Sequence, residues 1–254
     1  MSRVLGVIPA RIGSSRLPRK PLRPLLGKPL VLWVWERARR MRFLDRLVVA
    51  TDSEEVADVC RGAGAETLLT SPTHPTGTDR AWEVTRRLGR AFDVVVNIQG
   101  DEPLVEAGAV RAAISMVERG FDAGTCAAPV RDEEEFRDPA VVKVVRAGGG
   151  RALYFSRAAI PHTCDRAEER PHRRANSRLK HVGIYAYRPE ALGRWVGFGR
   201  SPLELQEGLE QLRALENGMR IGVAVVAEAA GGVDTPRDLE RMESRLRRGG
   251  ATEA

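Results

Sequence analysis

The feature that most constrains this chain is the alternation of apolar and amphipathic segments in its N-terminal part. Apolar, β-rich runs at 4–8, 46–52 and 66–69 are typical of buried strands. Helical periodicity covers 30–40 and 53–60 between them. Strands that are joined by single helices through short connections pair in parallel. The pattern therefore predicts an α/β fold with a mostly parallel sheet flanked by helices.

Length and composition limit the class of protein further. A chain of 254 residues with 43% hydrophobic and 30% charged residues is expected to be a soluble globular protein, built as one large domain or two small ones. No apolar stretch reaches bilayer length and no signal-peptide core opens the chain, so we expect a cytoplasmic location and no membrane partner. Cys60, Cys126 and Cys164 form no CxxC pair, which argues against a disulfide framework or a zinc site.

The formal net charge of +7 has two interpretations. It permits nucleic-acid binding. However, the arginines are scattered among 34 acidic residues, and a basic enzyme with a polyanionic substrate has the same sign of charge. We therefore expect no nucleic-acid partner.

A basic loop follows the first strand, after Pro9. It carries these cations and small residues: Arg11, Gly13, Ser14, Ser15, Arg16, Arg19 and Lys20. Such a loop at the carboxyl end of a strand can wrap a polyphosphate with N–H groups and cations. It contains neither GxxxxGK[ST] nor GxGxxG, and its charge taken by itself favours a solvated basic turn.

Two further loops leave predicted strands at the same edge. In the loop 71–80, Thr76 or Thr78 could cap the helix expected over 79–89 or contact a ligand. After the strand 93–98, Asp101 and Glu102 could cap a helix over 106–119 or hold Mg²⁺ on a bound triphosphate.

The second half of the sequence changes architecture. Strand patterns follow one another at 123–130, 141–145, 152–157, 181–187 and 221–226. One helix is expected over 201–215, solvated acids over 131–138, a mobile loop over 162–180 and disorder over 247–254. We predict one domain with a Rossmann-like core (1–130 and 231–246) and a smaller mixed β-rich lobe (131–230).

In this order, the segments resemble the 3-deoxy-manno-octulosonate (Kdo) cytidylyltransferases over nearly the whole chain. The matching motifs are VIPAR (7–11), SRLP (15–18), KPL (20–22), GKP (27–29), VATD (49–52), GT (77–78), NIQGDEP (97–103), ALYFSR (152–157), HVGIY (181–185), SPLE (201–204), LEQLR (209–213) and VDTP (233–236). The resemblance implies a nucleotidyltransferase-type sheet with a sugar-binding and dimerisation lobe, and a homodimer. It also implies a Mg²⁺-dependent reaction of CTP with Kdo to CMP-Kdo and pyrophosphate, for lipopolysaccharide synthesis.

The resemblance also implies roles for particular residues. Arg11 and Lys20 would be catalytic cations on the triphosphate, and Asp101 and Asp234 would be catalytic Mg²⁺ ligands. The nucleotide site would comprise Ala10, Arg11, Ser14, Ser15, Lys20, Thr76, Gly77, Thr78 and Gln99. The sugar site would comprise Arg157, His181, Tyr185, Glu210 and Gln211. Without the resemblance, a structural histidine, a core tyrosine and a solvated glutamate are the ordinary interpretations of His181, Tyr185 and Glu210.

The sequence departs from the family pattern in a few places. Arg19 stands where glycine is usual, Thr76 and Asp79 replace serine and glutamate, and 162–180 matches poorly. The alternatives are activation of another acid sugar (8-amino-Kdo or a sialic acid), a nucleic-acid-binding module and a glycosyltransferase. The last lacks a clear DxD motif in this sequence.

Overall fold

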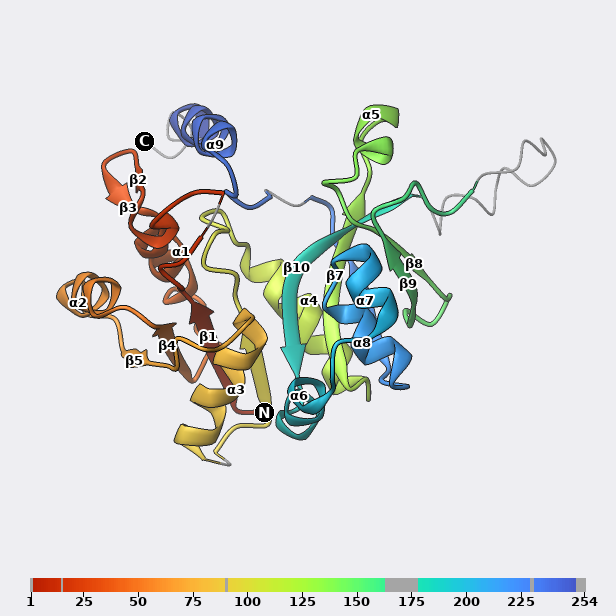
Figure 1. The fold of residues 1–254 in the computed structure, drawn as a ribbon, viewed down its shortest axis with the longest axis horizontal. Helices are drawn as coiled ribbons and strands as arrows, with labels where there is room; N and C mark the ends of the chain where they lie inside the picture. Colours follow the sequence, from red (N-terminus) through yellow and green to blue (C-terminus); the bar gives the residue numbers. More distant parts are fainter. Residues whose placement is uncertain (1, 15, 90, 163–177, 229–230, 250–254) are drawn as a thin grey trace. The chain divides into compact units, whose positions relative to one another are not determined.

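The computed structural model describes residues 2–14, 16–89, 91–162, 178–228 and 231–249. The chain divides into two compact units, which we name unit 1 (Met1–Ala107 with Ala230–Ala254) and unit 2 (Gly108–Ala229). In Figure 1, unit 1 runs from red to yellow and includes the dark blue helix α9 (Pro236–Gly249), whereas unit 2 runs from yellow-green to lighter blue. No helix in the described ranges has the length and apolar character of a membrane span.

Unit 1 contains the predicted parallel sheet. Its strands lie in the order β6 (Val94–Asn97), β1 (Val4–Pro9), β4 (Arg46–Thr51) and β5 (Thr67–Leu69). All three pairings are parallel. The central strands are apolar on both faces because helices cover both, and Leu5, Val7 and Ile8 of β1 are fully buried. The mostly parallel α/β prediction is confirmed.

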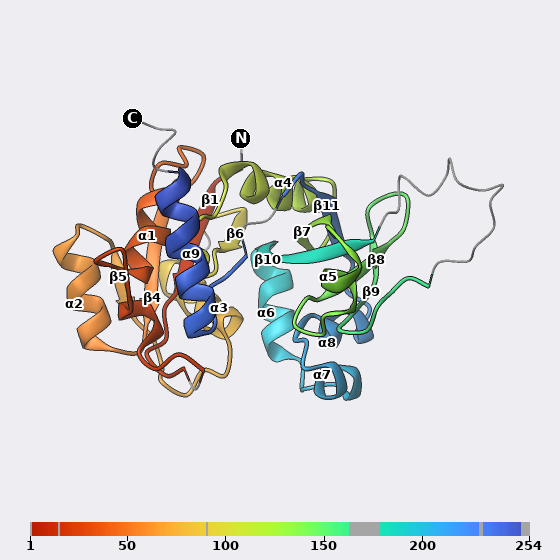
Figure 2. The same cartoon turned by 90° about the horizontal axis from the view of Figure 1, so that it is seen from above.

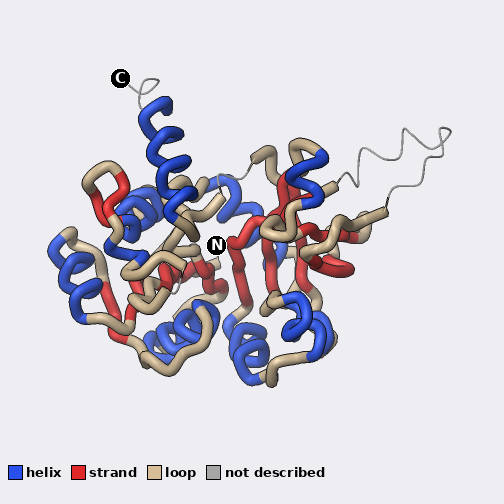
Figure 3. The backbone as a smooth tube through the Cα atoms, turned by 45° about the horizontal axis from the view of Figure 1, so that its top comes forward, coloured by secondary structure: helices blue, strands red, loops and turns tan. Residues whose placement is uncertain are grey.

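The helices of unit 1 are α1 (Leu30–Ala38), α2 (Glu54–Gly62), α3 (Gly77–Leu88) and α9 (Pro236–Gly249). Ser53 caps α2 by accepting the N–H of Val56, as expected of a residue of its type at that position. α3 packs on β1, β4 and β6, and α2 packs on β4 and β5. Figure 3 shows these helices in blue around the red strands.

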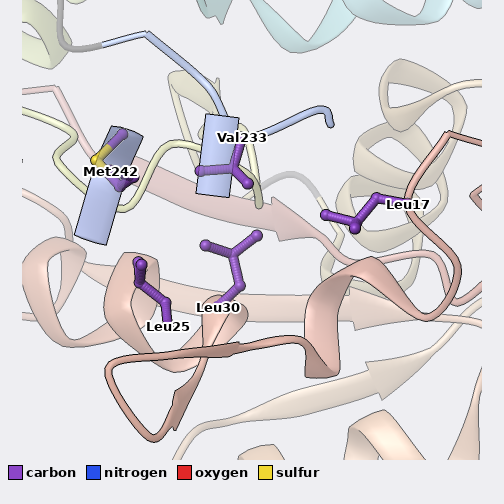
Figure 4. Close-up of a cluster of buried hydrophobic side chains, with 5 residues drawn as sticks. All are labelled: Leu17, Leu25, Leu30, Val233 and Met242. Carbon is purple, nitrogen blue, oxygen red and sulfur yellow. The ribbon is translucent and has the colours of Figure 1, made fainter. Parts of the chain in front are cut away.

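A short 3₁₀ helix, η1 (Lys20–Leu22), and a hairpin of β2 (Pro24–Leu25) and β3 (Lys28–Pro29) precede α1. The sequence patterns did not predict either of them, because two-residue strands leave no periodicity to detect. An apolar cluster joins these elements to α9: Leu17, Leu25, Leu30, Val233 and Met242 (Figure 4). Through this cluster the C-terminal helix packs among elements from the start of the chain, which Figure 2 shows from above.

Unit 2 is a mixed, β-rich unit, as predicted. β7 (Ala123–Pro129) pairs with β10 (Leu179–Tyr187) antiparallel and with β11 (Ile221–Val225) parallel. β8 (Lys143–Arg146) and β9 (Ala152–Ser156) form the expected hairpin, and β8 also pairs with β10. The helices are α4 (Ala107–Glu118), α5 (Glu133–Arg137), α6 (Pro189–Gly197), α7 (Pro202–Glu207) and α8 (Gln211–Glu216).

Unit 2 corrects three expectations. The single helix predicted over 201–215 is two helices, because Gly208 adopts a left-handed conformation (φ 63°) that ends α7. α6, which follows β10, was not predicted. Glu135 is not a solvated acid: it bonds Lys180 Nζ at 2.6 Å and the N–H of Arg131 at 2.7 Å.

The division into units falls after Ala107, whereas the sequence suggested a boundary at 130. β7 belongs with unit 2 because it pairs with β10 and β11. Disorder was expected from residue 247, but α9 extends to Gly249. Residues 250–254 lie outside the described part. Most of the loop 162–180 also lies outside it, and the end of that range is already in β10.

Candidate active site

A cluster of opposite charges lies at the carboxyl edge of the unit 1 sheet. Lys20 Nζ donates hydrogen bonds to Asp101 Oδ2 and, at 2.8 Å, to Asp234 Oδ1. Arg16 adds a second cation, with NH2 at 3.2 Å from Asp234 Oδ1. The side chains of Lys20, Asp101 and Asp234 are 14%, 27% and 43% exposed, so the cluster is open to solvent on the carboxylate side.

Three separate segments bring this cluster together. Lys20 begins η1, after Arg19 in a left-handed conformation, and Asp101 follows β6. Gly100 fits there because any Cβ would lie 2.4 Å from the carbonyl oxygen of Pro9. The N–H of Val233 donates to the Asp101 carbonyl at 2.9 Å, which fixes the segment that carries Asp234.

The apolar cluster of Figure 4 supports this arrangement. Leu17 lies one residue from Arg16, and Val233 lies one residue from Asp234. Both side chains are buried in the same cluster. The burial of Leu17 and Val233 therefore holds Arg16 and Asp234 in place. Each fully buried aliphatic side chain stabilises the fold by about 1.5–3 kcal/mol.

The charges in the cluster shift one another's protonation. Burial disfavours the charged form of Lys20, but Coulombic attraction and hydrogen bonds from Asp101 and Asp234 outweigh it and raise the pKa of Lys20. Protein packed around the Glu102 carboxyl, together with the neighbouring charge of Asp101, raises the pKa of Glu102 to about 8, although the residue as a whole is half-buried. Lys20 thus stays cationic at neutral pH.

Asp101 and Asp234 could hold a Mg²⁺ ion, because carboxylate oxygens are ligands that this ion takes. Their carboxylates converge on one cationic nitrogen, which shows that a single cation can contact both. Mg²⁺ takes one or two protein carboxylates and completes its shell with water and phosphate oxygens. Within the described residues, no group of three or more histidine, cysteine, aspartate or glutamate side chains is arranged to hold a metal ion.

The basic loop after β1 is held by its backbone. Ala10 is buried, donates its N–H to the Ala50 carbonyl and accepts from the hydroxyl of Thr51. Arg11 is exposed, with NH1 at 3.5 Å from the Pro75 carbonyl oxygen. Ser14 Oγ accepts the N–H of Leu17 at 3.3 Å. Ser15 lies outside the described residues.

The loop before α3 ends in a capping box. Thr76 Oγ1 accepts the N–H groups of Thr78 and Asp79, and Asp79 Oδ2 accepts the N–H of Thr76 at 3.1 Å. The helix-cap interpretation of Thr76 is confirmed, and the helix starts at Gly77, two residues before the expected start. Thr78 is buried, so a ligand would meet the backbone at this helix start more readily than the Thr78 side chain.

Gln99 and Asn97 flank the end of β6. Gln99 is half-buried in the turn that leads to Asp101, and its backbone carbonyl accepts the N–H of Glu102 at 3.2 Å. Asn97 is buried, and its Oδ1 has no hydrogen-bond partner within the described residues. No role was predicted for Asn97 from the sequence. Arg16 was named among the cations of the basic loop but was not assigned to the site, where the structure pairs it with Asp234.

The residues assigned to the sugar by resemblance all lie in unit 2. Arg157 is bound on three sides: Nε donates to the Glu207 carbonyl at 2.8 Å, NH1 donates to the Pro139 carbonyl at 2.9 Å, and the backbone N–H donates to Glu207 Oε2. Burial opposes the charge of Glu207, but the hydrogen bonds of Arg157 and Ser156 outweigh it and lower the pKa of Glu207.

His181 and Tyr185 lie in an aromatic group with Phe155, Tyr187 and Trp195. Burial lowers the pKa of His181 to about 3, so its ring is neutral at physiological pH. Burial raises the pKa of Tyr185. Its hydroxyl lies near Thr125 but makes no hydrogen bond of normal geometry within the described ranges.

Thr125 holds His181 in place, and the sequence reasoning did not single it out. Thr125 Oγ1 lies 2.9 Å from His181 Nε2 and 2.7 Å from the Ile184 carbonyl oxygen. A hydroxyl has one proton, and the carbonyl can only accept it, so we assign the proton of His181 to Nε2 and leave Nδ1 as an acceptor.

Glu210 is not a solvated residue. Its Oε1 accepts the indole N–H of the buried Trp195 at 3.1 Å. Glu210 is the N-cap residue of α8, and Gln211, the first residue of that helix, is buried. Unit 2 therefore brings His181, Tyr185 and Glu210 to one aromatic group, with Trp195 as the residue that joins them.

A parallel sheet with cations and carboxylates at its carboxyl edge is typical of nucleotide-binding α/β proteins. The family model "Cytidylyltransferase" matches residues 5–221. The chain is 45% identical over 248 residues to the 3-deoxy-manno-octulosonate cytidylyltransferase of Syntrophotalea carbinolica (96% of this chain, 98% of the relative). It is 48% identical over 243 residues to that of Gemmatimonas aurantiaca (95% and 93%).

Solved structures are also similar to this chain. A structure of CMP:2-keto-3-deoxy-manno-octonic acid synthetase complexed with CTP matches with a TM-score of 0.88 and 37% identity, covering 98% of this chain and 100% of that one. A 4-diphosphocytidyl-2C-methyl-D-erythritol synthase from Anaerococcus prevotii (TM-score 0.64, 12% identity, 97% of this chain and 99% of that one) shares the fold. The chain belongs to the cytidylyltransferase family, and within it to the 3-deoxy-manno-octulosonate cytidylyltransferases, so the resemblance noted in the sequence is confirmed.

Proposed function

We propose that this chain transfers the cytidylyl group of CTP to Kdo, forming CMP-Kdo and pyrophosphate for lipopolysaccharide synthesis. The observation that carries the proposal is the convergence of Lys20, Asp101 and Asp234 from three distant segments at the carboxyl edge of a parallel sheet. That edge is where open α/β sheets bind nucleotides. Family membership narrows the nucleotide to CTP and the acceptor to an acid sugar.

The reaction needs positioning and charge neutralisation. The anomeric hydroxyl of the sugar attacks the α-phosphorus, the new O–P bond forms in line with the breaking bond to pyrophosphate, and the hydroxyl proton is lost. Negative charge develops on the leaving pyrophosphate, where fixed cations stabilise the transition state. The bonds of Lys20 and Arg16 to Asp234 support this role for the two cations, and the exposed Arg11 belongs to the same loop.

The ion pairs of Lys20 and Arg16 also keep the site neutral before CTP binds. Two cations face two carboxylates, so the incoming triphosphate can take over the cations without leaving a buried charge unpaired. Asp101 and Asp234 are then free to hold Mg²⁺. When it is bound there, Mg²⁺ would neutralise triphosphate oxygens and favour the departure of pyrophosphate.

In unit 2, the donors and acceptors suit a carboxylated, hydroxyl-rich ligand. Arg157 is a candidate for the sugar carboxylate, since a guanidinium matches two carboxylate oxygens. The unpaired hydroxyl of the buried Tyr185 is a polar group that a sugar hydroxyl could satisfy. His181 offers Nδ1 as an acceptor, and Glu210 and Gln211 lie at the start of α8.

The proposal extends to location and assembly. A cytoplasmic location follows from the supply of CTP there, and a homodimer is what the resemblance implies. Size-exclusion chromatography with light scattering would test the dimer directly.

The decisive experiment measures pyrophosphate release from CTP and Mg²⁺ with Kdo, 8-amino-Kdo and sialic acid in parallel. UTP and ATP serve as nucleotide controls, and a reaction with EDTA tests the metal. We expect release with CTP and Kdo that EDTA abolishes. Release only with another acid sugar would keep the cytidylyl transfer and change the assignment of the sugar residues Arg157, His181 and Glu210. Absence of release with every sugar would contradict the proposal.

A further inference from the structure

The carboxyl end of β4 connects the two loops that carry the proposed nucleotide ligands. Asp52 Oδ1 accepts the N–H of Ile12 at 3.0 Å, which fixes the basic loop one residue after Arg11. Asp52 Oδ2 accepts Arg80 NH2 at 2.6 Å, which ties the same carboxylate to α3. From the sequence, Asp52 had no role beyond its place in the VATD motif, and Ser53 is the residue that caps α2.

Arg80 continues the connection to the second loop. Its NH1 donates to Thr70 Oγ1 at 2.7 Å and to the Ser71 carbonyl at 3.2 Å, at the start of the segment that leads to Thr76. The side chain is 1% exposed, so no solvent competes with these bonds. A single buried guanidinium therefore links Asp52 to the beginning of the loop before α3.

Thr51, the residue before Asp52, makes a second set of bonds to the same two loops. Thr51 Oγ1 donates to the Ala10 carbonyl at 2.6 Å, and the Thr51 carbonyl accepts the Thr70 N–H at 2.8 Å and the Thr70 hydroxyl at 3.1 Å. Thr51 thus contacts both loops through its hydroxyl and its carbonyl, and Asp52 contacts them through one hydrogen bond and one buried ion pair.

We propose that the Asp52–Arg80 ion pair is a positioning pair that sets the spacing of the two nucleotide loops. This inference rests on the proposed function, since it assumes that Arg11 and the start of α3 contact CTP. Neither Asp52 nor Arg80 touches the reacting atoms in this account. They act by keeping the N–H groups and cations of both loops in the arrangement that fits one nucleotide.

Stability alone is a weak explanation of the pair. Burying two charges costs desolvation energy that their attraction offsets only in part, and apolar replacements of buried ion pairs are often neutral. Arg80 Nε is also buried without a hydrogen-bond partner within the described residues, which adds to the cost. A pair of this kind is best explained by the geometry that it imposes on its partners.

The test is Asp52→Asn, which keeps an oxygen for the Ile12 N–H and removes the charge that faces Arg80. We expect the KM for CTP to rise by about ten-fold or more, because small displacements of binding groups cost this much. The KM for Kdo and kcat should stay within about three-fold. Isothermal titration with CTP should show the same loss in affinity. In the double variant Asp52→Asn/Arg80→Gln, the two effects should not multiply, because both changes break one interaction.

A matched control separates positioning from general destabilisation. Glu204 and Arg213 form a buried ion pair in unit 2, with side chains 5% and 7% exposed. Glu204→Gln should lower the Tm as much as Asp52→Asn does but leave the KM for CTP unchanged. If Asp52→Asn does not fold, Thr70→Val replaces it, since this variant removes an acceptor of Arg80 without changing any charge.

The outcomes separate the two proposals. An active wild-type protein whose KM for CTP is unchanged in Asp52→Asn and Thr70→Val overturns the positioning role and leaves the proposed function intact. An equal rise in the KM for CTP in Glu204→Gln also overturns it. A wild-type protein that neither binds CTP nor releases pyrophosphate overturns the proposed function, and the positioning role with it.

Discussion

In unit 1, the ammonium of Lys20 bonds two carboxylates that remain 27% and 43% exposed, whereas in unit 2 the guanidinium of Arg157 bonds two backbone carbonyls. Ion pairs that are open to solvent can exchange partners when a charged ligand arrives. Bonds to backbone carbonyls also hold the chain, and breaking them loosens the fold. Both cations stand in family motifs. The sequence does not distinguish them, but the structure makes Lys20 a charge that can exchange its partners and Arg157 a donor that holds the chain.

The largest expected change in activity comes from replacing the two carboxylates of unit 1, Asp101 and Asp234. Asp101→Asn and Asp234→Asn should each lower kcat/KM by about a thousand-fold or more, because the variants weaken the cation site at the triphosphate. The Tm should change little, since both side chains are partly exposed. Pyrophosphate release and thermal melting measure the two quantities.

The matched control is Glu36→Gln, which removes another lysine–carboxylate pair, Lys28–Glu36, also in unit 1. It should leave kcat/KM within about two-fold. A near-normal rate in Asp101→Asn or Asp234→Asn would remove that residue from the site and weaken the contrast between the units.

The second prediction sharpens the contrast in unit 2. Arg157→Ala should lower the free energy of unfolding by about 1–3 kcal/mol, because it removes donors to the Glu207 and Pro139 carbonyls. Urea unfolding measures this loss, and the KM for Kdo is measured in parallel. Arg194→Ala, which breaks an exposed pair with Asp122, should cost much less. A large rise in the KM for Kdo without any loss of stability would make Arg157 a ligand residue alone.

The third prediction concerns pH and His181. Folding keeps the ring neutral, with a pKa of about 3, whereas the unfolded chain takes up a proton near pH 6.5. The unfolded state therefore binds more protons below that pH, and stability falls as the pH falls. Between pH 7 and pH 5.5 the contribution of His181 is a loss of about 1 kcal/mol.

Urea unfolding at several pH values, compared between the wild type and His181→Asn, measures this contribution. The wild-type curve should be steeper over this interval. Equal slopes would contradict the neutral, buried ring, because His181 would then take up a proton as easily in the folded protein as in the unfolded chain.

The smallest effect is expected for Arg19→Gly. Arg19 has φ 58°, a left-handed conformation that costs a non-glycine residue about 1–2 kcal/mol, and glycine relieves this at an entropic cost of about 0.5–1 kcal/mol. The lost pair with Glu55 is exposed on both sides and contributes little. We expect the free energy of unfolding to change by less than about 1 kcal/mol. Glu55→Gln isolates the ion pair; a larger loss in Arg19→Gly than in Glu55→Gln would show that Arg19 orders the loop.

Local sequence patterns predicted the strands and most helices, because each of these elements depends on residues close together in the sequence. β1, β4 and β6 are runs of apolar residues, and the cap of α2 is a serine next to its helix. The break between α7 and α8 was missed although Gly208 is visible in the sequence, since the apolar spacing on either side continues as if the helix were unbroken. The hairpin β2–β3 was missed because two-residue strands depend on packing against α9 and α1.

The candidate site shows the same limit. Lys20 and Asp101 could be named because each stands in a loop after a strand, and the resemblance added Asp234. The partnership of Lys20 with both carboxylates, the link from Asp52 through Arg80 to Thr70, and the support of His181 by Thr125 join residues distant in sequence. No periodicity or motif spacing encodes such pairs.

The sequence by itself determined the α/β class, the order of the strands along the chain and the family to which the chain belongs, because these depend on local periodicity and on motifs read in register. The tertiary structure alone decided which charges face one another and which polar groups are already occupied by the protein. The physical reason is that burial and hydrogen-bond partners are properties of the packed chain: Arg80 is an ordinary helical arginine in the sequence and a buried link between two loops in the fold.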